Sequence, residues 1–453
     1  MAQFSFNLKP RKVERISTKN RTIKTKIPAP GSLSIIKSLK NYESSNAVQQ
    51  LPVIWDKAIN HIIYDPYGNK WIDFTSSIFV ANSGHGNKDV IKEISKHLKK
   101  PLLHSYYYPT KIRMQFLKKL LRISPNYLDK AILLSAGTEA TERAIKIARI
   151  YGNKNKKKYI IAWEGNYHGK TLNAQMISGQ FSDHKWIPQF DKNIIHLPFP
   201  YPWLLKKKKV NGKQLFQIHL KILQKKINLN QISSFFVESF QGWGAIFYPK
   251  DYISELQKFV NKNKSLLIFD EIQAGFYRTG KLFAFEHYNV KPDLVICGKG
   301  ISGSLPLSAV IGKSKYINLD SAYTSTHGGN PIACAASLGN LKIFEKNGFH
   351  KSLKIKSKIM ESKLNTWKKL FPKRVKAILG KGFIWGVFIY NKKGTALDNN
   401  LTNRICERAM EKGVFSICTG RGTLKLGPPL TITTSALREG LDVYEECLRE
   451  MLS

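Results

Sequence analysis

Four short segments of this chain combine small residues with residues that can do chemistry. The first, Ser135–Glu142, leads from an apolar stretch through Gly137 and Thr138 into an amphipathic pattern. A glycine lets the backbone approach a ligand, and the N–H groups at the start of a helix favour an anion, to which Thr138 adds a hydroxyl. This pattern indicates a phosphate-binding turn, with an ordinary capped helix as the alternative.

The second segment, Tyr167-His168-Gly169-Lys170-Thr171, follows a short apolar run. An aromatic residue beside a glycine at the end of a strand can stack on a planar ring. In the third segment Asp270 and Glu271 end a fully apolar run. A buried carboxylate is costly unless it is paired, so we expect Asp270 to have a cationic or hydrogen-bonding partner, or a chemical role. The alternative is that the acidic pair caps the following turn.

The fourth segment places Lys299 between Gly298 and Gly300, directly after another apolar run. A phosphate cradle, a stacking aromatic ring, a carboxylate and a lysine are together the parts that hold pyridoxal phosphate. The carboxylate serves its pyridine nitrogen and the lysine forms its Schiff base.

The elements that position these four segments are expected to be short apolar runs, in which apolar and polar residues do not alternate. They alternate with helical patterns from about residue 131 and occupy residues 131–134, 159–162, 234–238, 266–270, 294–297 and 307–311. Continuous apolar strands are typical of a parallel sheet that is buried on both faces, and such sheets bind ligands at the carboxyl ends of their strands. Helical spacing also occurs at residues 33–41, 88–100, 110–122 and 331–346, and paired strands are expected within 53–80.

The sequence resembles the class III, or omega-amino-acid type, aminotransferases, which depend on pyridoxal phosphate. The resemblance extends from about Arg21 to Leu448. It rests on Ser-x-Gly-Thr-Glu-Ala, Tyr-His-Gly-Lys-Thr, Asp-Glu-Ile-Gln-x-Gly-x-x-Arg-Thr-Gly, Gly-Lys-Gly-Ile and Ser-Thr-His-Gly-Gly-Asn-Pro (325–331), in the family's order and spacing. It implies ping-pong transfer of an amino group from an ω-amino acid or other primary amine to a 2-oxo acid, namely 2-oxoglutarate or pyruvate.

The resemblance also implies an α/β fold of the fold-type I class. A large domain carries a mostly parallel, seven-stranded-type sheet, and a smaller α+β domain comes from both ends of the chain. The expected boundaries are a basic N-terminal arm at 1–30, an N-terminal part of the small domain at 31–85, the large domain at 86–345 and the C-terminal small domain at 346–453.

Roles for individual residues follow from the same resemblance. Lys299 forms the Schiff base and shuttles the proton, while Asp270 keeps the pyridine nitrogen protonated. Gln273 lies near the ring hydroxyl, and Tyr167 stacks on the ring. The other expected cofactor residues are Gly137 and Thr138 at the phosphate, His168, Glu238, and Thr326, which reaches the cofactor of the neighbouring subunit in a homodimer.

Departures from the family's pattern concern the substrate. Trp243 stands where many members have a glutamate, and Lys425 stands where the arginine that pairs with that glutamate is expected. Lys170 also stands where many members have an arginine. A lysine keeps the positive charge but lacks the bidentate hydrogen-bonding fork of the guanidinium. Arg421 lies four residues before Lys425. In an extended segment both side chains face the same side, roughly 13 Å apart, so Arg421 is a candidate for carboxylate capture.

The composition first suggests a different function. The 453 residues carry a formal charge of +42, which favours nucleic-acid binding. However, 59 of the 73 basic residues are lysines, and arginine is the residue that reads phosphates and bases bidentately. We therefore expect neither nucleic-acid nor membrane partners. A basic anion- or nucleic-acid-binding protein with a vestigial site stays an alternative, as does another pyridoxal phosphate reaction, such as that of an aminomutase or racemase.

The five cysteines are scattered, which favours a reduced, cytoplasmic protein without a metal site. Residues 1–30 hold eight Lys and Arg residues and one Glu. An organellar transit peptide is the alternative interpretation of that arm.

Overall fold

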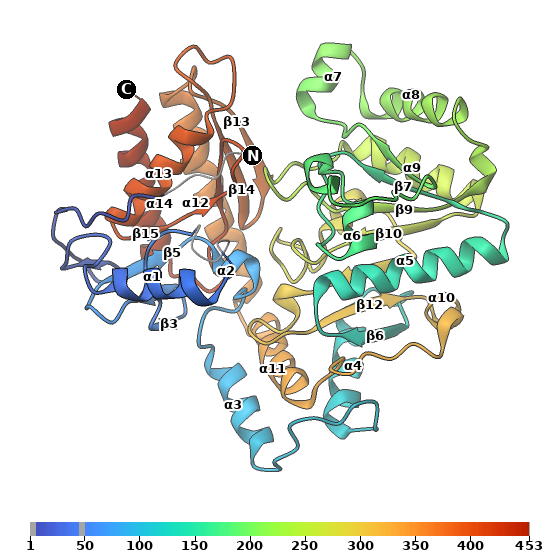
Figure 1. Ribbon diagram of the computed structural model, residues 1–453, viewed down its shortest axis with the longest axis horizontal. Helices are drawn as coiled ribbons and strands as arrows, with labels where there is room; N and C mark the ends of the chain where they lie inside the picture. Colours follow the sequence, from blue (N-terminus) through green and yellow to red (C-terminus); the bar gives the residue numbers. More distant parts are fainter. Residues whose placement is uncertain (1–5, 45–49, 453) are drawn as a thin grey trace. The chain divides into compact units, whose positions relative to one another are not determined.

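A computed structural model describes residues 6–44 and 50–452, and Figure 1 shows their helices and strands. The chain forms two compact units. Residues 1–88, 243–245 and 344–453 make up the first unit, and residues 89–242 and 246–343 make up the second. The first unit is therefore assembled from three separate pieces of chain.

The second unit contains one sheet of seven strands (Figure 1). In chain order they are β6 (Lys130–Leu134), β7 (Tyr159–Trp163), β8 (Ile194–Leu197), β9 (Ile232–Glu238), β10 (Leu266–Asp270), β11 (Leu294–Cys297) and β12 (Ser308–Gly312). Across the sheet the order is β6-β12-β11-β10-β9-β7-β8. Only β12 runs antiparallel to its neighbours, so the predicted α/β fold with a mostly parallel sheet is confirmed.

Continuous burial explains why these strands have no alternating pattern. Every residue of β9, β10 and β11 is buried, as expected for strands with both faces covered. Helix α5 (Gly137–Lys154) packs its small and branched side chains against the sheet, and this cluster includes Ala144, Ile147, Ile268 and Val310. The short strand β8 was not expected. Its four residues, Ile-Ile-His-Leu, do not form a continuous apolar run, and only the first and last of them are buried.

Further helices of the second unit complete its frame. They are α3 (Lys88–Leu98), α4 (Lys111–Ile123), α6 (Leu172–Ile177), α7 (Pro202–Lys208), α8 (Gly212–Gln224), α9 (Lys250–Asn263) and α11 (Pro331–Lys342). The lysine run of residues 206–209 is exposed on and after α7, as a solvated face requires.

The first unit combines two sheets with helices. One sheet has the order β1-β2-β5-β4-β3, with β15 paired to β5, and the other has the order β13-β14-β17-β16. The strands are β1 (Ile16–Ser17), β2 (Thr22–Ile23), β3 (Lys57–Ile59), β4 (Ile62–Tyr64), β5 (Lys70–Asp73), β13 (Val375–Lys381), β14 (Ile384–Ile389), β15 (Val414–Phe415), β16 (Ile417–Cys418) and β17 (Thr423–Leu426). Helices α1 (Ser32–Tyr42), α2 (Ser76–Phe79), α12 (Phe349–Leu370), α13 (Asn399–Glu411) and α14 (Thr434–Leu452) accompany them.

Residues 6–30 are integrated into the first unit. Phe6, Ile23 and Ile27 are buried in a cluster with Trp71. The positive charges of this segment are also used, since Arg21 forms an ion pair of 2.7 Å with Glu439. The segment is therefore anchored to the unit by buried apolar side chains and by this ion pair, while most of its other basic side chains are exposed. Among the described residues, no helix combines the length and apolar content needed to cross a bilayer.

Candidate active site

Parallel strands bring the predicted cofactor residues to one edge of the seven-stranded sheet. Asp270, the last residue of β10, lies beside Glu238, the last residue of β9, and its other neighbour is Ile296 on β11. Strand β11 leads directly to Lys299, and β7 leads to the segment that carries Tyr167. The sheet itself therefore gathers chemistry-bearing residues that are far apart in the sequence.

Asp270 has the partner that its burial requires. Its Oδ2 lies 2.8 Å from Nδ1 of His168, and its Oδ1 accepts a hydrogen bond of 2.9 Å from the N–H of Ile272. His168 is fixed in turn, because its backbone N–H donates to the Ser178 hydroxyl at 2.8 Å. With the imidazole proton on Nδ1, each of the two carboxylate oxygens accepts one hydrogen bond. The other nitrogen, Nε2, has no hydrogen-bond partner among the described residues.

Glu238 ties the neighbouring loops together. Its Oε2 accepts from the N–H of Tyr167 at 3.1 Å, and its Oε1 accepts from the N–H of Gly242 at 3.0 Å. A side chain at position 242 would meet Gln273 Oε1 at 2.8 Å and Glu238 Oε1 at 2.9 Å. Gly242 is therefore needed for the side chains of Gln273 and Glu238 to lie together at this edge.

Lys299 occupies an unusual backbone position. Its φ is +46°, in the left-handed region that non-glycine residues rarely adopt and that often marks functional sites. Burial lowers the pKa of Lys299 below its ordinary value, and the negative charges of Asp270 and Glu238 act in the opposite direction. A lowered pKa increases the fraction of neutral amine, which is the nucleophilic form that a Schiff base requires.

The start of α5 carries Gly137 and Thr138, the two residues expected at the phosphate. A side chain at position 137 would meet Ile272 Cδ1 at 3.0 Å, so any larger residue would require the Ile272 side chain to shift. The Thr138 hydroxyl lies 2.7 Å from the Thr171 hydroxyl and accepts a hydrogen bond of 3.3 Å from the Thr171 N–H. These hydroxyls lie at the start of α5, where the backbone N–H groups of a helix favour an anion such as a phosphate group.

Glu142 organises this turn, and the sequence interpretation gave it no role. It accepts hydrogen bonds from the Thr171 hydroxyl at 2.6 Å, from the N–H groups of Asn173 and Ala174 at 3.0 Å each, and from the Asn173 amide at 2.9 Å. It therefore caps α6 and fixes the direction of the Thr171 hydroxyl. The only signal in the sequence is an acidic residue that follows Thr138 by one helical turn.

Glu271 has a structural role, although it does not cap the turn directly after its strand. Its carboxylate accepts from the Ser239 hydroxyl at 2.5 Å and from the N–H groups of Ala284 and Phe285 at 2.8 Å each. Burial raises the pKa of Glu271 to about 8, and these hydrogen bonds oppose the rise. Glu271 thus caps the start of the 3-10 helix Ala284–Tyr288, thirteen residues further along the chain, while Asp270 is bound to the histidine.

Three of the expected substrate residues lie in the first unit. The guanidinium of Arg421 lies 5.6 Å from the centre of the Trp243 ring, and Trp243 packs edge-on against Phe388 at 5.5 Å. Lys425 is buried in the middle of β17, with its ammonium 4.7 Å from the centre of the Phe79 ring. Arg421 and Trp243 thus form one cluster, and Lys425 and Phe79 form another.

The extended geometry expected around Arg421 is wrong. Arg421 precedes β17 in a turn between Gly420 and Gly422, whose φ values are +69° and +70°. Left-handed glycines reverse the chain, so the strand spacing of about 13 Å to Lys425 does not apply. The turn instead places Arg421 over Trp243.

The unusual backbone conformation of α2 places the Phe79 ring beside Lys425. Four consecutive non-glycine residues, 76–79, have φ between +48° and +71°. The Ser76 hydroxyl donates to the Gly427 carbonyl at 2.7 Å, and a side chain at position 427 would approach the Phe79 ring to 2.1 Å. A left-handed turn of this length is costly, so the packing around Gly427 must hold it in place.

Lys170 and Thr326 are exposed. The Thr326 carbonyl accepts a hydrogen bond of 2.9 Å from Nε2 of His104. Within the described residues nothing links Lys170 to the other site residues.

Known proteins resemble this chain over nearly its whole length. The model of the family described as aminotransferase class-III matches residues 43–448. The 4-aminobutyrate aminotransferase of Mycobacterium leprae (strain TN) is 30% identical over 443 residues, which cover 95% of this chain and 98% of that protein. An alanine/serine racemase of Pyrococcus horikoshii (strain OT-3) is 27% identical over 464 residues, covering 99% and 97%.

Solved structures show the same fold. An (S)-enantioselective omega-transaminase from Thermomicrobium roseum superposes with a TM-score of 0.84 at 22% identity, covering 93% of this chain and 99% of that one. The residues around Asp270, Lys299 and the start of α5 fit pyridoxal phosphate, since the second unit offers an oriented carboxylate, an amine of lowered pKa and a glycine-walled anion turn. The chain belongs to the class III aminotransferase family, whose members are pyridoxal-phosphate-dependent enzymes of fold type I.

Proposed function

We propose that this aminotransferase takes the amino group of an ω-amino acid or another primary amine remote from a carboxylate and passes it to a 2-oxo acid by a ping-pong mechanism. The cluster of Arg421, Trp243 and Phe388 is the observation that carries the choice of donor. An aromatic wall favours the alkyl chain of an amine, and a guanidinium beside it favours a distal carboxylate. 2-Oxoglutarate and pyruvate are the acceptors we expect.

Pyridoxal phosphate, when bound, supplies a conjugated ring that accepts the electron pair released at the substrate carbon. The residues of the chain bind it and move protons. In this proposal Gly137, Thr138 and the start of α5 bind the phosphate, and Tyr167 stacks on the ring. Asp270, oriented by His168, holds a proton at the pyridine nitrogen.

Lys299 has two tasks in the proposal. Its Nζ would hold the cofactor covalently. Once the substrate amine had displaced it from the cofactor, the free Lys299 amine would take up and return the proton at the substrate carbon. The lowered pKa of Lys299 favours both tasks, because each needs the neutral amine. Gln273 and Glu238 complete the wall of the site near the ring hydroxyl.

We propose a homodimer in which Thr326 serves the cofactor of the partner subunit. Support comes from the surface of the neighbouring loop, where Leu103, Tyr106 and Tyr108 are exposed to 56%, 44% and 75%. Large apolar side chains gathered on a surface favour burial against another protein. His104, in the same loop, contacts the Thr326 carbonyl and so connects this apolar surface with Thr326.

A cytoplasmic location is also part of the proposal. All five cysteines are free thiols, and such thiols are typical of a reducing compartment.

The test of the proposed activity starts from the colour of the purified protein. We expect a yellow chromophore that borohydride fixes to Lys299 and that the Lys299→Ala variant lacks. A panel of amines, scored by conversion of the bound pyridoxal to the pyridoxamine form, then identifies the donor class. A colourless protein after addition of cofactor, with nucleic-acid binding that falls steeply with salt, would instead support the nucleic-acid interpretation.

Racemisation is the second candidate, because one relative is an alanine/serine racemase. The two activities differ in stoichiometry. A transaminase consumes one molecule of 2-oxo acid for each amine, whereas a racemase converts its substrate without one. Chiral analysis of alanine and serine with and without 2-oxoglutarate separates them.

A further inference from the structure

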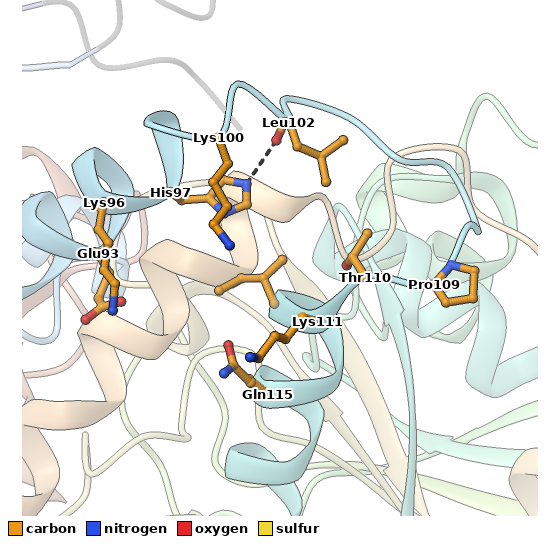
Figure 2. Close-up of a pocket in the computed structure, with 10 residues that line it drawn as sticks. Glu93, Lys96, His97, Lys100, Leu102, Pro109, Thr110, Lys111 and Gln115 are labelled. Carbon is orange, nitrogen blue, oxygen red and sulfur yellow. Dashed lines mark hydrogen bonds between the residues drawn. The ribbon is translucent and has the colours of Figure 1, made fainter.

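A basic pocket opens between α3 and α4 of the second unit (Figure 2). Its volume of about 470 Å³ falls within the range of roughly 300–1,000 Å³ that is typical of small-molecule sites. Lys96 and His97 come from α3, Lys100 from the loop that follows, and Lys111 from the first turn of α4. None of the residues proposed to hold pyridoxal phosphate lines this pocket.

The charges of the pocket do not cancel. Lys96, Lys100 and Lys111 form no ion pair with any residue in the described parts of the chain. Glu93, the acidic residue of the lining, is already paired with Lys342 of α11. Figure 2 shows the side chains of Lys100 and Lys111 extending toward the space between the two helices. Like charges that converge without an acid repel one another, and an anion placed among them removes this cost.

The kind of cation indicates the kind of anion. Arginine forks bind carboxylates and phosphates alike, whereas lysine ammonium groups act as point charges. Three of them favour a phosphate monoester, which carries nearly two negative charges at neutral pH, over a carboxylate, which carries one. The nearby Arg113 is used elsewhere, since its Nη1 donates to the Gly328 carbonyl at 3.1 Å and its guanidinium lies 4.6 Å from the centre of the Tyr107 ring. The cationic groups that the described residues bring to the pocket are therefore those of lysines, without a guanidinium.

The remaining lining residues restrict the rest of the ligand. Leu102, Pro109 and Ile112 give the pocket an apolar side. The loop that carries Leu102 is held in place, because Nε2 of His97 lies 2.9 Å from the Leu102 carbonyl (Figure 2). The His97 ring thus connects α3 with the loop, and the pocket has a defined wall on that side.

We propose that this pocket binds a phosphate monoester with a small apolar body. The phosphate lies among the ammonium groups of Lys96, Lys100 and Lys111, and the apolar body lies against Leu102 and Ile112. The Thr110 hydroxyl, which caps α4 by accepting from the Arg113 N–H at 3.3 Å, also lines the pocket.

The test uses the holoenzyme after borohydride reduction, so that a covalently held cofactor fills its own phosphate site. Phenyl phosphate, inorganic phosphate and benzoate are titrated by calorimetry at constant ionic strength. We expect saturable binding of phenyl phosphate, at least threefold weaker binding of inorganic phosphate, and at least tenfold weaker binding of benzoate. The variant Lys100→Glu/Lys111→Glu should lose at least ~30-fold in affinity for phenyl phosphate.

A matched control removes the effect of net charge. The variant Lys207→Glu/Lys208→Glu on α7 makes the same change in charge on an exposed helix, and its affinity for phenyl phosphate should stay within twofold of the parent protein. Equal losses in the two variants, binding that does not saturate, or benzoate binding as tight as that of phenyl phosphate would each overturn the proposal.

Discussion

His168 and Asp270 form a buried pair, with Nδ1 of the imidazole 2.8 Å from Oδ2 of the carboxylate and side-chain exposures of 0% and 5%. Removing a hydrogen-bond donor from a buried charge costs about 1.5–3 kcal/mol. We therefore expect His168→Phe to lower kcat by about 10- to 100-fold while the KM for the amine changes little.

The conservative variant His168→Asn separates positioning from packing. The asparagine amide can still donate toward Asp270, so this variant should recover part of the lost kcat. A pH titration of the near-visible absorbance of the bound cofactor should be displaced in His168→Phe and close to normal in His168→Asn. Equal behaviour of the two variants would contradict the role that we give to this hydrogen bond.

Glu142 should matter for the phosphate of the cofactor more than for its ring. Glu142→Gln replaces one acceptor oxygen with a donor group opposite N–H and O–H donors, so the Thr171 and Thr138 hydroxyls lose their fixed direction. We expect an affinity for pyridoxal phosphate about tenfold lower, and an affinity for pyridoxal, which has no phosphate, within twofold of normal. Fluorescence titration of the apoenzyme measures both, with Glu255→Gln on α9 as the control.

Lys425 and Arg421 should act on the acceptor through its second carboxylate. Lys425→Met removes a buried cation from the Phe79 ring, and Arg421→Ala removes the guanidinium from Trp243. We expect the apparent KM for 2-oxoglutarate to rise about tenfold in the first variant and about threefold in the second. The KM for pyruvate, which lacks that carboxylate, should stay nearly constant. Unchanged steady-state constants for 2-oxoglutarate in both variants would remove these residues from the site.

Mixed dimers test whether Thr326 acts across subunits. A heterodimer of Lys299→Ala and Thr326→Val subunits has one site with a normal lysine. If Thr326 serves the partner's cofactor, that site also receives a normal threonine and binds pyridoxal phosphate as tightly as the unmodified enzyme. If Thr326 acts within its own subunit, the same site is as weak as in the Thr326→Val homodimer. Cofactor titration of the purified heterodimer distinguishes the two outcomes.

His61 should make the protein sensitive to acid. It is buried, neither ring nitrogen has a hydrogen-bond partner in residues 6–44 and 50–452, and burial lowers its pKa to about 4, with Asp73 opposing and Lys356 adding to the shift. As the pH falls below about 6.5, the unfolded chain takes up the proton first, so stability is lost between pH 6.5 and 4. The loss is at most ~3 kcal/mol.

The variant His61→Phe should abolish this loss. A phenyl ring fills a similar volume and leaves no partner group unpaired, so the melting temperature should rise more at pH 5 than at pH 8. The exposed His350→Phe exchange is the matched control and should give the same small change at both values. A His61→Phe protein with the acid sensitivity of the parent would show that other groups are responsible.

The sequence was sufficient for those parts of the site that a strand places by itself. Asp270, Glu238 and Lys299 end or follow apolar runs, and adjacent parallel strands leave little freedom in where such residues lie. The direction of β12 could not be predicted, because an apolar run of five residues looks the same in parallel and antiparallel neighbours.

Residues positioned by turns were harder to predict. The position of Arg421 depends on two left-handed glycines, and that of Phe79 on a left-handed turn of four ordinary residues, for which the sequence has no pattern. The role of Glu142 depends on hydrogen bonds to residues about thirty positions away, which periodicity does not show. Likewise, the lysines of residues 6–30 suggested an arm, while the buried Phe6 and Ile27 decide that the segment packs.

The pairing of β5 with β15 has a consequence for how the protein is made. Val414 is the parallel neighbour of Ile72, while β2 pairs with the same strand only at Lys70. The part of this strand edge at Ile72 and Asp73 therefore has no partner until residues 414 and 415 have been synthesised. The residues of the second unit, by contrast, are complete once residue 343 has been synthesised. A nascent chain of this enzyme therefore carries an open, apolar strand edge ahead of a domain able to fold, and chaperones that shield such edges should govern its yield.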